Sequence, residues 1–272
     1  MDASPELKAA LDAAATAADI ARSLYRRNLA VRVKSDKSPV TEADLRCELA
    51  IREILCERFP TYGFLGEETG SAGAGAESLW LVDPIDGTKA FVREYPLFST
   101  QIALMRAGEI VLGVSSAPVY GEIAYAERGG GAWLDGEPIG VSEVGSIGEA
   151  ALSAGNLRSL ASGAGWSAYG ALVARVDRIR GYGDFLHYHL LASGRIDVVL
   201  ESDVNILDVA AAAAIVTEAG GRFTDLEGQP LGLTSTSVLA SNGRLHGPVL
   251  AALSGSSESG GPSADRSRPP RD

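Results

Sequence analysis

Residues 80–88, with the sequence WLVDPIDGT, join a short apolar strand to an acidic turn. Asp83 and Asp86 stand where the strand is expected to end, separated by a proline and an isoleucine and followed by a glycine. The proline fixes one backbone angle and the glycine frees another, so both carboxylates and the Ile85 carbonyl can face a common point. Sites in α/β proteins commonly lie where a strand opens into a turn. This segment therefore predicts a functional site at the end of a buried strand.

Oxygen donors of this kind indicate a hard divalent cation. Carboxylates combined with a backbone carbonyl suit Mg²⁺, and the sequence has no Cys/His cluster that would indicate zinc. Gly87 and Thr88 add backbone N–H groups and a hydroxyl that can bind phosphate oxygens. Upstream, Glu67 and Glu68 form an acidic pair able to bind metal and polarise a water, and Asp208 opens a predicted helix further along. The pattern predicts a metal-dependent phosphate site.

Each of these acids also has an ordinary structural explanation. Asp44 lies in a capping-box pattern that begins at Thr41, and Asp208 can stabilise its helix by about 1 kcal/mol without any catalytic role. Glu67 and Glu68 can belong to a solvated loop, and an Asp-Gly pair at 86–87 is common in turns. Their joint occurrence favours the functional interpretation.

The composition of the whole chain is that of a globular protein. Its 272 residues are 46% hydrophobic, enough to bury a core, and 35 acidic against 24 basic residues give a net charge of −11. This charge repels phosphate backbones and anionic lipid, so we expect neither nucleic-acid nor membrane binding. An acidic phosphate-handling enzyme needs local positive charge, which bound cations can supply. The N-terminus lacks the pattern of a signal peptide, and no apolar run reaches membrane-spanning length, which predicts a cytoplasmic protein.

Hydrophobic periodicity divides the chain into two halves, 1–136 and 137–253. In the first half it predicts helices at 5–29 and 42–58, a polar connection at 34–40, and a largely antiparallel sheet with strands at 79–83, 98–106, 110–117 and 122–127. In the second half strands and helices alternate, with strands at 151–154, 196–200 and 236–240 and helices at 166–176, 184–193, 208–219 and 243–253. Residues 254–272 are small, polar and proline-rich, so we expect a disordered tail. Cys47 and Cys56 are expected to be buried thiols.

Three stretches, in this order, resemble the signature of the inositol-monophosphatase superfamily. They are 66–68, 80–88 and 208–210 together with 217–221, and the resemblance extends over roughly 5–253. It implies a mixed α+β and α/β fold, the five-layer αβαβα sandwich of the inositol-monophosphatase/fructose-bisphosphatase type. It also implies dependence on two or three Mg²⁺ ions per site, the usual inhibition by lithium, and a homodimer.

The resemblance further assigns roles to individual residues. The implied metal ligands are Glu67, Asp83, the Ile85 carbonyl, Asp86 and Asp208. Mg²⁺ would neutralise the phosphate, lower the pKa of a bound water and stabilise the leaving alkoxide during in-line attack, without a covalent intermediate.

Other implied roles concern the attacking water and the substrate. Asp44 and Thr88 would pair to hold this water, and Glu67 would also be catalytic. Glu68 would lie behind the metal ligands and stabilise their positions without binding the metal itself. Gly87, Thr88 and Asp208 would also contact the substrate. The family usually has tryptophan immediately before the last metal aspartate, where this chain has Leu207.

The segments 180–186 and 190–197 resemble the histidinol-phosphate phosphatase branch, in which an acid follows the glycine. Asp184 can therefore meet the ammonium or imidazole of histidinol, a contact worth about 1.5–3 kcal/mol, although it can also simply cap a helix. Glu201 matches the position from which the family contacts substrate hydroxyls or amine. His187 and His189 should face apart on their helix, and we interpret them as structural. The leading hypothesis is a histidinol-phosphate phosphatase of histidine biosynthesis, acting on a small phosphomonoester.

Three alternatives stay open. The first two are an inositol monophosphatase and a 3′(2′),5′-bisphosphate nucleotidase. Residues 86–89, DGTK, resemble the phosphoadenosine-phosphate branch, and Lys89 and Arg93 can bind a second anion, which Asp184 would oppose. The third is a non-catalytic regulatory module, against which the intact set of acids argues.

Overall fold

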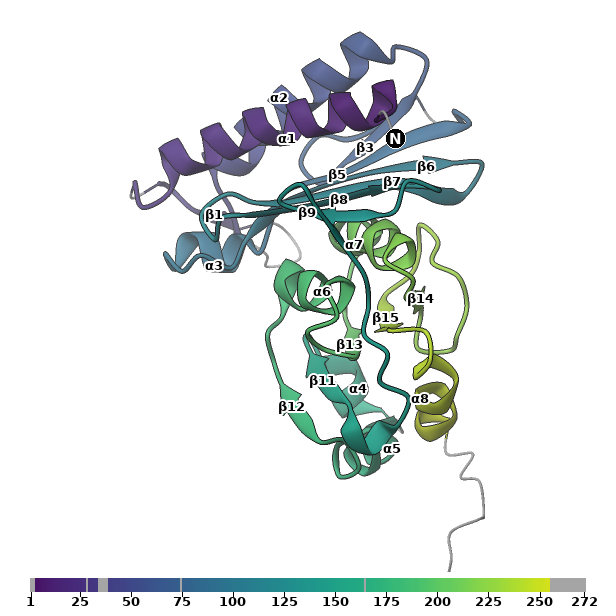
Figure 1. The fold of residues 1–272 in the computed structure, drawn as a ribbon. Coiled ribbons are helices and arrows are strands. Elements are labelled where there is room, and N and C mark those ends of the chain that lie inside the picture. Colours follow the sequence, from purple (N-terminus) through teal and green to yellow (C-terminus); the bar gives the residue numbers. More distant parts are fainter. Residues whose placement is uncertain (1–2, 28, 34–38, 74, 164, 255–272) are drawn as a thin grey trace, which may run out of the picture.

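The computed structural model describes residues 3–27, 29–33, 39–73, 75–163 and 165–254. Helices and sheets alternate in the order αβαβα (Figure 1), which confirms the expected sandwich. Most of the predicted connection at 34–40 and of the predicted disordered tail lie outside the described residues. The division of the chain at residue 136 remains a prediction.

The first layer consists of α1 (Pro5–Leu24) and α2 (Glu42–Arg58). Ser4 caps α1 by accepting a hydrogen bond from the Leu7 N–H, and a stripe of buried alanines lets α1 approach α2 and the sheet. The helix predicted over 5–29 ends at Leu24, because Tyr25 is extended. A short pair, β1 (Arg32–Val33) and β2 (Pro39–Val40), lies between the helices in the sequence.

The second layer is an eight-stranded sheet with the order β10-β9-β8-β7-β6-β5-β3-β4. All pairs in it are antiparallel except β3 with β5, which is parallel. In β5, Trp80 and Val82 pack toward α1 and α2, whereas Leu81 packs on the opposite face. The strands are β3 (Gly63–Gly66), β4 (Gly70–Ala72), β5 (Ser78–Asp86), β6 (Ser99–Arg106), β7 (Glu109–Ala117), β8 (Glu122–Glu127), β9 (Ala132–Leu134) and β10 (Glu137–Ile139).

The central layer contains α6 (Asp184–Ala192) and α7 (Ile206–Glu218) between the two sheets (Figure 1). Nearly every side chain of α7 is buried, as expected for a helix covered on both sides. A Cβ at Gly113 would lie 2.3 Å from the Ala211 carbonyl oxygen, so this glycine lets α7 rest directly on β7. Several helix boundaries differ from the prediction: α6 ends before Ser193, α7 begins before Asp208 and ends at Glu218, and the helices predicted at 166–176 and 243–253 are shorter than predicted.

The second sheet has five strands in the order β12-β11-β13-β15-β14. In β13, Val199 faces α7, while Val198 and Leu200 face the outer helices. The strands are β11 (Ala151–Ala154), β12 (Arg178–Arg180), β13 (Val198–Ser202), β14 (Arg222–Thr224) and β15 (Ser237–Ser241). The outer helices are α4 (Arg158–Ser162), α5 (Gly165–Val173) and α8 (His246–Leu253); two short helices elsewhere are α3 (Thr88–Val92) and η1 (Ile147–Glu149).

The cysteines differ from each other in exposure. Cys47 is buried, as predicted, and its thiol lies 3.5 Å from the Ala17 carbonyl oxygen. Cys56 is only half-buried at the margin of the same core, so the prediction is wrong for this residue. Within the described part of the chain, none of the helices combines the length and apolarity needed to span a bilayer.

A buried histidine joins α8 to the second sheet. His246 lies 3.0 Å from the Thr224 hydroxyl through Nε2 and 3.0 Å from the Ser241 hydroxyl through Nδ1. Burial lowers the pKa of His246 from 6.5 to about 4, so the folded protein keeps this imidazole neutral.

We expect acid to destabilise the protein through His246. Between about pH 6.5 and pH 4 this histidine is protonated in the unfolded chain but stays neutral in the folded chain. The free energy of unfolding therefore decreases as the pH is lowered through this range. The expected loss between pH 7 and pH 4.5 is about 2 kcal/mol. Urea unfolding should show this loss reduced in His246→Gln but retained in Thr224→Val, which keeps the imidazole. Equal pH dependence in wild type and His246→Gln would contradict the assignment.

Candidate active site

The predicted site residues gather in a cleft of about 740 Å³ to which both sheets contribute. Strand β5 ends in it, α3 and α6 begin at it, and β13 and α7 close its other side. The predicted residues that line the cleft are Glu67, Asp83, Ile85, Asp86, Gly87, Thr88, Asp184, Glu201 and Asp208. The individual roles of these residues remain predictions.

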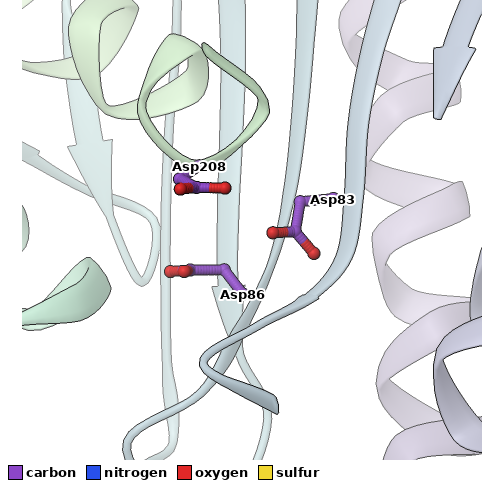
Figure 2. Close-up of side chains that lie close together, drawn as sticks. All are labelled: Asp83, Asp86 and Asp208. Carbon is purple, nitrogen blue, oxygen red and sulfur yellow. The ribbon is translucent and has the colours of Figure 1, made fainter. Parts of the chain in front are cut away.

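Asp83, Asp86 and Asp208 form the acidic centre of the cleft (Figure 2). One carboxylate oxygen from each lies within 4.8 Å of the others. Asp208 reaches Asp83 and Asp86 from the first turn of α7, where its Oδ2 also accepts a hydrogen bond of 2.9 Å from the Asn205 N–H. Asp208 therefore caps its helix and faces the site at once, so the capping interpretation and the site interpretation coexist.

The charges in this cluster oppose one another. Burial, followed by the neighbouring acids, raises the pKa of both Asp83 and Asp86 well above the ordinary value. Burial is also the main reason that the pKa of Asp208 rises to about 6. Converging carboxylates, which carry the same negative charge, fit a hard divalent cation, because the cation favours their ionised form and replaces repulsion with attraction.

The backbone at the end of β5 is held in a bulged turn. The pairing of β5 with β6 shifts between Asp83 and Asp86, and Asp83 Oδ1 accepts a hydrogen bond of 2.9 Å from the Ile85 N–H. Gly87 follows with φ 86°, and a Cβ there would lie 2.8 Å from the Leu97 carbonyl oxygen. Glycine is thus required at position 87 for two reasons: the backbone angle φ is positive, and the Leu97 carbonyl leaves no space for a side chain.

Asp44 contacts the cleft through Thr88. The Thr88 hydroxyl lies 3.1 Å from Asp44 Oδ1 and 3.1 Å from the Ile85 carbonyl oxygen. Asp44 Oδ2 accepts hydrogen bonds from the Thr41 N–H at 2.8 Å and hydroxyl at 2.7 Å, which completes the predicted capping box. Burial raises the pKa of Asp44. The structure therefore brings together the Asp44–Thr88 pair that the sequence analysis assigned to the attacking water.

Glu48 is a site residue that the sequence analysis missed. Its buried carboxylate accepts hydrogen bonds from the Glu68 N–H at 2.7 Å and the Thr69 N–H at 2.6 Å. A Cβ at Gly66 would lie 2.4 Å from Glu48 Oε1, so only glycine lets the carboxylate approach. Glu48 thereby fixes the turn that presents Glu67. Its position four residues after Asp44, on the same helix face, was the available signal.

Glu201 is held by donors from three directions. Its Oε1 accepts from the Asn156 N–H at 3.2 Å, and its Oε2 lies 3.1 Å from His187 Nε2 and accepts from the Tyr188 hydroxyl at 2.5 Å. Burial opposes ionisation, but these contacts prevail and hold the pKa of Glu201 below its ordinary value. A Cβ at Gly155 would lie 1.6 Å from Glu201 Oε1. Nothing local in the sequence pointed to these partners.

Asp184 begins α6 with an unusual backbone. Its φ is 45°, a left-handed conformation that is uncommon for residues other than glycine and that often occurs at functional sites. The helix N-cap is Gly183, without a side-chain capping bond, so the capping explanation for Asp184 is wrong. Burial and then Glu201 raise the pKa of Asp184, while His187 and Lys89 lower it. The side chain lines the cleft instead.

Comparison with known proteins decides the family. The model of the inositol monophosphatase family matches residues 2–258. The chain belongs to the inositol monophosphatase family. The resemblance inferred from residues 66–68, 80–88, 208–210 and 217–221 is thereby confirmed.

Several members of this family resemble the chain over most of its length. The histidinol-phosphatases of Mycobacterium tuberculosis and Streptomyces coelicolor are each 40% identical, and their alignments cover 83% of this chain and 88% of each relative. An inositol-1-monophosphatase of Rhizobium meliloti is 36% identical, covering 79% of this chain and 83% of its own. The crystal structure of the extragenic suppressor protein suhB from Bartonella henselae has a TM-score of 0.84 and 31% identity, covering 92% of this chain and 98% of its own.

Leu207 stands where the family resemblance predicts a tryptophan. It is an apolar residue buried in the core that α7 shares with both sheets. Leucine at this position packs in the core, and the neighbouring Asp208 lines the cleft.

We expect Mg²⁺ to raise the thermal unfolding midpoint, and to do so more at about pH 8 than at about pH 5. The carboxylates must be ionised to bind it, and the pKa of Asp208 is about 6. At a concentration one hundred times the Kd the rise should be about 5–10 °C. Differential scanning fluorimetry should show the rise diminished in Asp208→Asn but retained in Asp19→Asn, an exposed α1 residue. A rise that does not depend on pH would count against this cluster.

Proposed function

We propose that this chain is a Mg²⁺-dependent phosphatase that releases phosphate from L-histidinol phosphate. The observation that carries the substrate assignment is the pair of carboxylates, Asp184 and Glu201, that lines the cleft beside the metal-binding acids. The relatives named histidinol-phosphatase support the same assignment. Phosphomonoester hydrolysis, the broader prediction from the sequence, agrees with the family.

The metal-binding half of the cleft would act on the phosphate. Asp83, Asp86, Asp208, Glu67 and the Ile85 carbonyl would hold two or three Mg²⁺ ions. When bound, these ions supply charge neutralisation at the phosphate and an acidified water.

The chain's own groups position the attacking water. The Thr88 hydroxyl can donate to Asp44, which leaves its lone pairs to accept a hydrogen bond from that water. Backbone N–H groups at Gly87 and Thr88 would bind the phosphate oxygens, and the carboxylate of Glu68, next to Glu67, would support the metal ligands.

The other half of the cleft would bind the histidinol cation. Glu201 is the better anchor for the ammonium group, because its three donors keep it ionised although it is buried. Asp184 lies near enough to Glu201 for their charges to repel, and a cation between them would relieve this repulsion. Charge-assisted contacts of this kind are about twice as strong as neutral hydrogen bonds.

The remaining features of the proposal follow the family. We propose a cytoplasmic homodimer that is sensitive to lithium. The net charge of −11 supports a small-molecule substrate rather than nucleic acid or a membrane surface.

Inositol phosphate is the second candidate substrate, because relatives named inositol-1-monophosphatase align over most of the chain. A bisphosphate nucleotide is less well supported. Lys89 lines the cleft and can meet a second anion, but Asp184 and Glu201 oppose one there. A non-catalytic regulatory role has no support in the contacts of the acidic centre.

A substrate panel tests the proposal directly. With Mg²⁺ present, kcat/KM should be highest for L-histidinol phosphate among histidinol phosphate, inositol 1-phosphate and phosphoadenosine phosphate. Asp83→Asn should lower phosphate release from every substrate at least a hundredfold, because it removes a metal ligand. A higher kcat/KM for inositol 1-phosphate would transfer the assignment to the second candidate, and no release from any substrate would favour a regulatory module.

Asp184→Asn tests the cation site separately. Asparagine tolerates the left-handed backbone but carries no charge, so we expect kcat/KM for histidinol phosphate to fall about ten- to a hundredfold. Turnover of inositol 1-phosphate should change much less. Asp203→Asn is the matched control, since Asp203 also lines the cleft with a positive φ of 61°. Equal losses for both substrates would exclude a specific contact between Asp184 and the cation.

A further inference from the structure

Helix α6 carries two histidines that face opposite layers of the molecule. His187 is fully buried and lies 3.1 Å from Glu201 of the second sheet. His189 is 2% exposed and lies 2.8 Å from Ser115 of the first sheet. The expected divergence of the two rings is confirmed. A structural interpretation alone leaves unexplained why each ring begins a chain of hydrogen bonds that ends on a carboxylate of the cleft.

The chain from His187 is short. The Tyr182 N–H donates to Ser153 Oγ at 3.2 Å, and the Ser153 hydroxyl lies 3.3 Å from His187 Nδ1. With Ser153 donating to Nδ1, His187 Nε2 carries the hydrogen and donates it to Glu201 Oε2. Ser153 thus fixes the ring, and the ring fixes the carboxylate that faces the cleft.

The chain from His189 begins at the opposite side of α6. A carboxylate only accepts hydrogen bonds, so His189 Nδ1 donates to Glu122 Oε2 at 3.1 Å. In the neutral ring Nε2 is then an acceptor, and it receives the hydroxyl hydrogen of Ser115. This leaves the Ser115 oxygen free to accept a hydrogen bond from elsewhere.

Gln101 continues this chain to the metal-binding acids. Its Nε2 donates both to Ser115 Oγ at 3.0 Å and to Ser99 Oγ at 2.7 Å. Ser99, whose oxygen is occupied by that donor, directs its own hydroxyl to Asp86 Oδ2 at 3.3 Å. Gln101 Oε1 is buried without a hydrogen-bond partner, which is destabilising. The orientation of the amide is explained by the two serines, because both amide hydrogens are donated to them.

We propose that His187 and His189 are positioning residues for the two halves of the cleft. His187 holds Glu201 toward the cationic end of the substrate, and His189, through Ser115, Gln101 and Ser99, holds Asp86 toward the metal. The carboxylates of Glu201 and Asp86 each lie among other acids. Without fixed hydrogen-bond donors, repulsion would turn each side chain away from its acidic neighbours. The His187 part rests on the proposed function, whereas the His189 part concerns metal binding alone.

Four variants on the same helix test this inference, and each pair serves as control for the other. His187→Phe and His189→Phe keep a planar ring but remove the nitrogens. His187→Gln and His189→Gln return an amide near the position of Nε2. L-histidinol phosphate and glycerol 2-phosphate serve as the cationic and the neutral-headed substrates, and circular dichroism and thermal unfolding confirm that each variant folds.

We expect the two phenylalanine variants to affect different measurements. His187→Phe should lower kcat/KM for histidinol phosphate about ten- to a hundredfold more than for glycerol 2-phosphate, with the Mg²⁺ Kd nearly unchanged. His189→Phe should weaken Mg²⁺ binding, measured by isothermal titration calorimetry, about three- to tenfold while preserving the preference between the substrates. Each glutamine variant should recover part of its own loss. Gln101→Met should reproduce the His189→Phe result.

The opposite results would overturn the inference. If each phenylalanine variant lowers kcat/KM for both substrates and the affinity for Mg²⁺ in parallel, the histidines only support packing. If His189→Phe and Gln101→Met leave the Mg²⁺ Kd unchanged, the His189 part is wrong. A wild-type protein that does not prefer histidinol phosphate to glycerol 2-phosphate refutes the proposed function and the His187 part with it. The His189 part is then decided by the calorimetry alone.

Discussion

Mutual repulsion among three converging carboxylates, one buried and two half-buried, is the constraint on which the cleft depends. Asp83 and Asp86 come from one strand end and Asp208 from a helix of the central layer, yet their oxygens lie within 4.8 Å of one another. In this fold two separate elements, β5 and α7, supply these groups. The layered fold brings β5 and α7 together, because α7 packs along the first sheet and approaches β7 directly at Gly113.

The acids around this centre are restrained by donors rather than by apolar packing. Thr41 holds Asp44, the backbone after Glu67 holds Glu48, and His187 with Tyr188 holds Glu201. Glycines at 66 and 155 allow two of these carboxylates to approach the chain where any side chain would collide. The cleft is thus prepared before any ligand arrives, which limits the reorganisation that binding and catalysis require.

Local patterns predicted the parts of the structure that local interactions determine. The capping box at Thr41, the turn around residues 83–87 and the helix at Asp208 were visible in a few consecutive residues, although β5 continues through a bulge to Asp86 instead of ending at Asp83. The short strands β3, β4, β9, β10, β12 and β14 were missed, because their pairing partners, not their own residues, make them strands. Likewise, residues 153, 187 and 201 are brought together by the fold alone, so no spacing in the sequence indicated that His187 would hold Glu201.

The burial of α7 on both sides has a consequence for synthesis on the ribosome. The first sheet is complete by residue 139, but its inner face is covered by residues 206–218, which emerge much later. Until then Leu81, Met105 and their neighbours present an uncovered apolar surface. The nascent chain therefore passes through a stage in which an apolar sheet face is exposed to chaperones, and the first sheet depends on a later segment of the chain to cover that face.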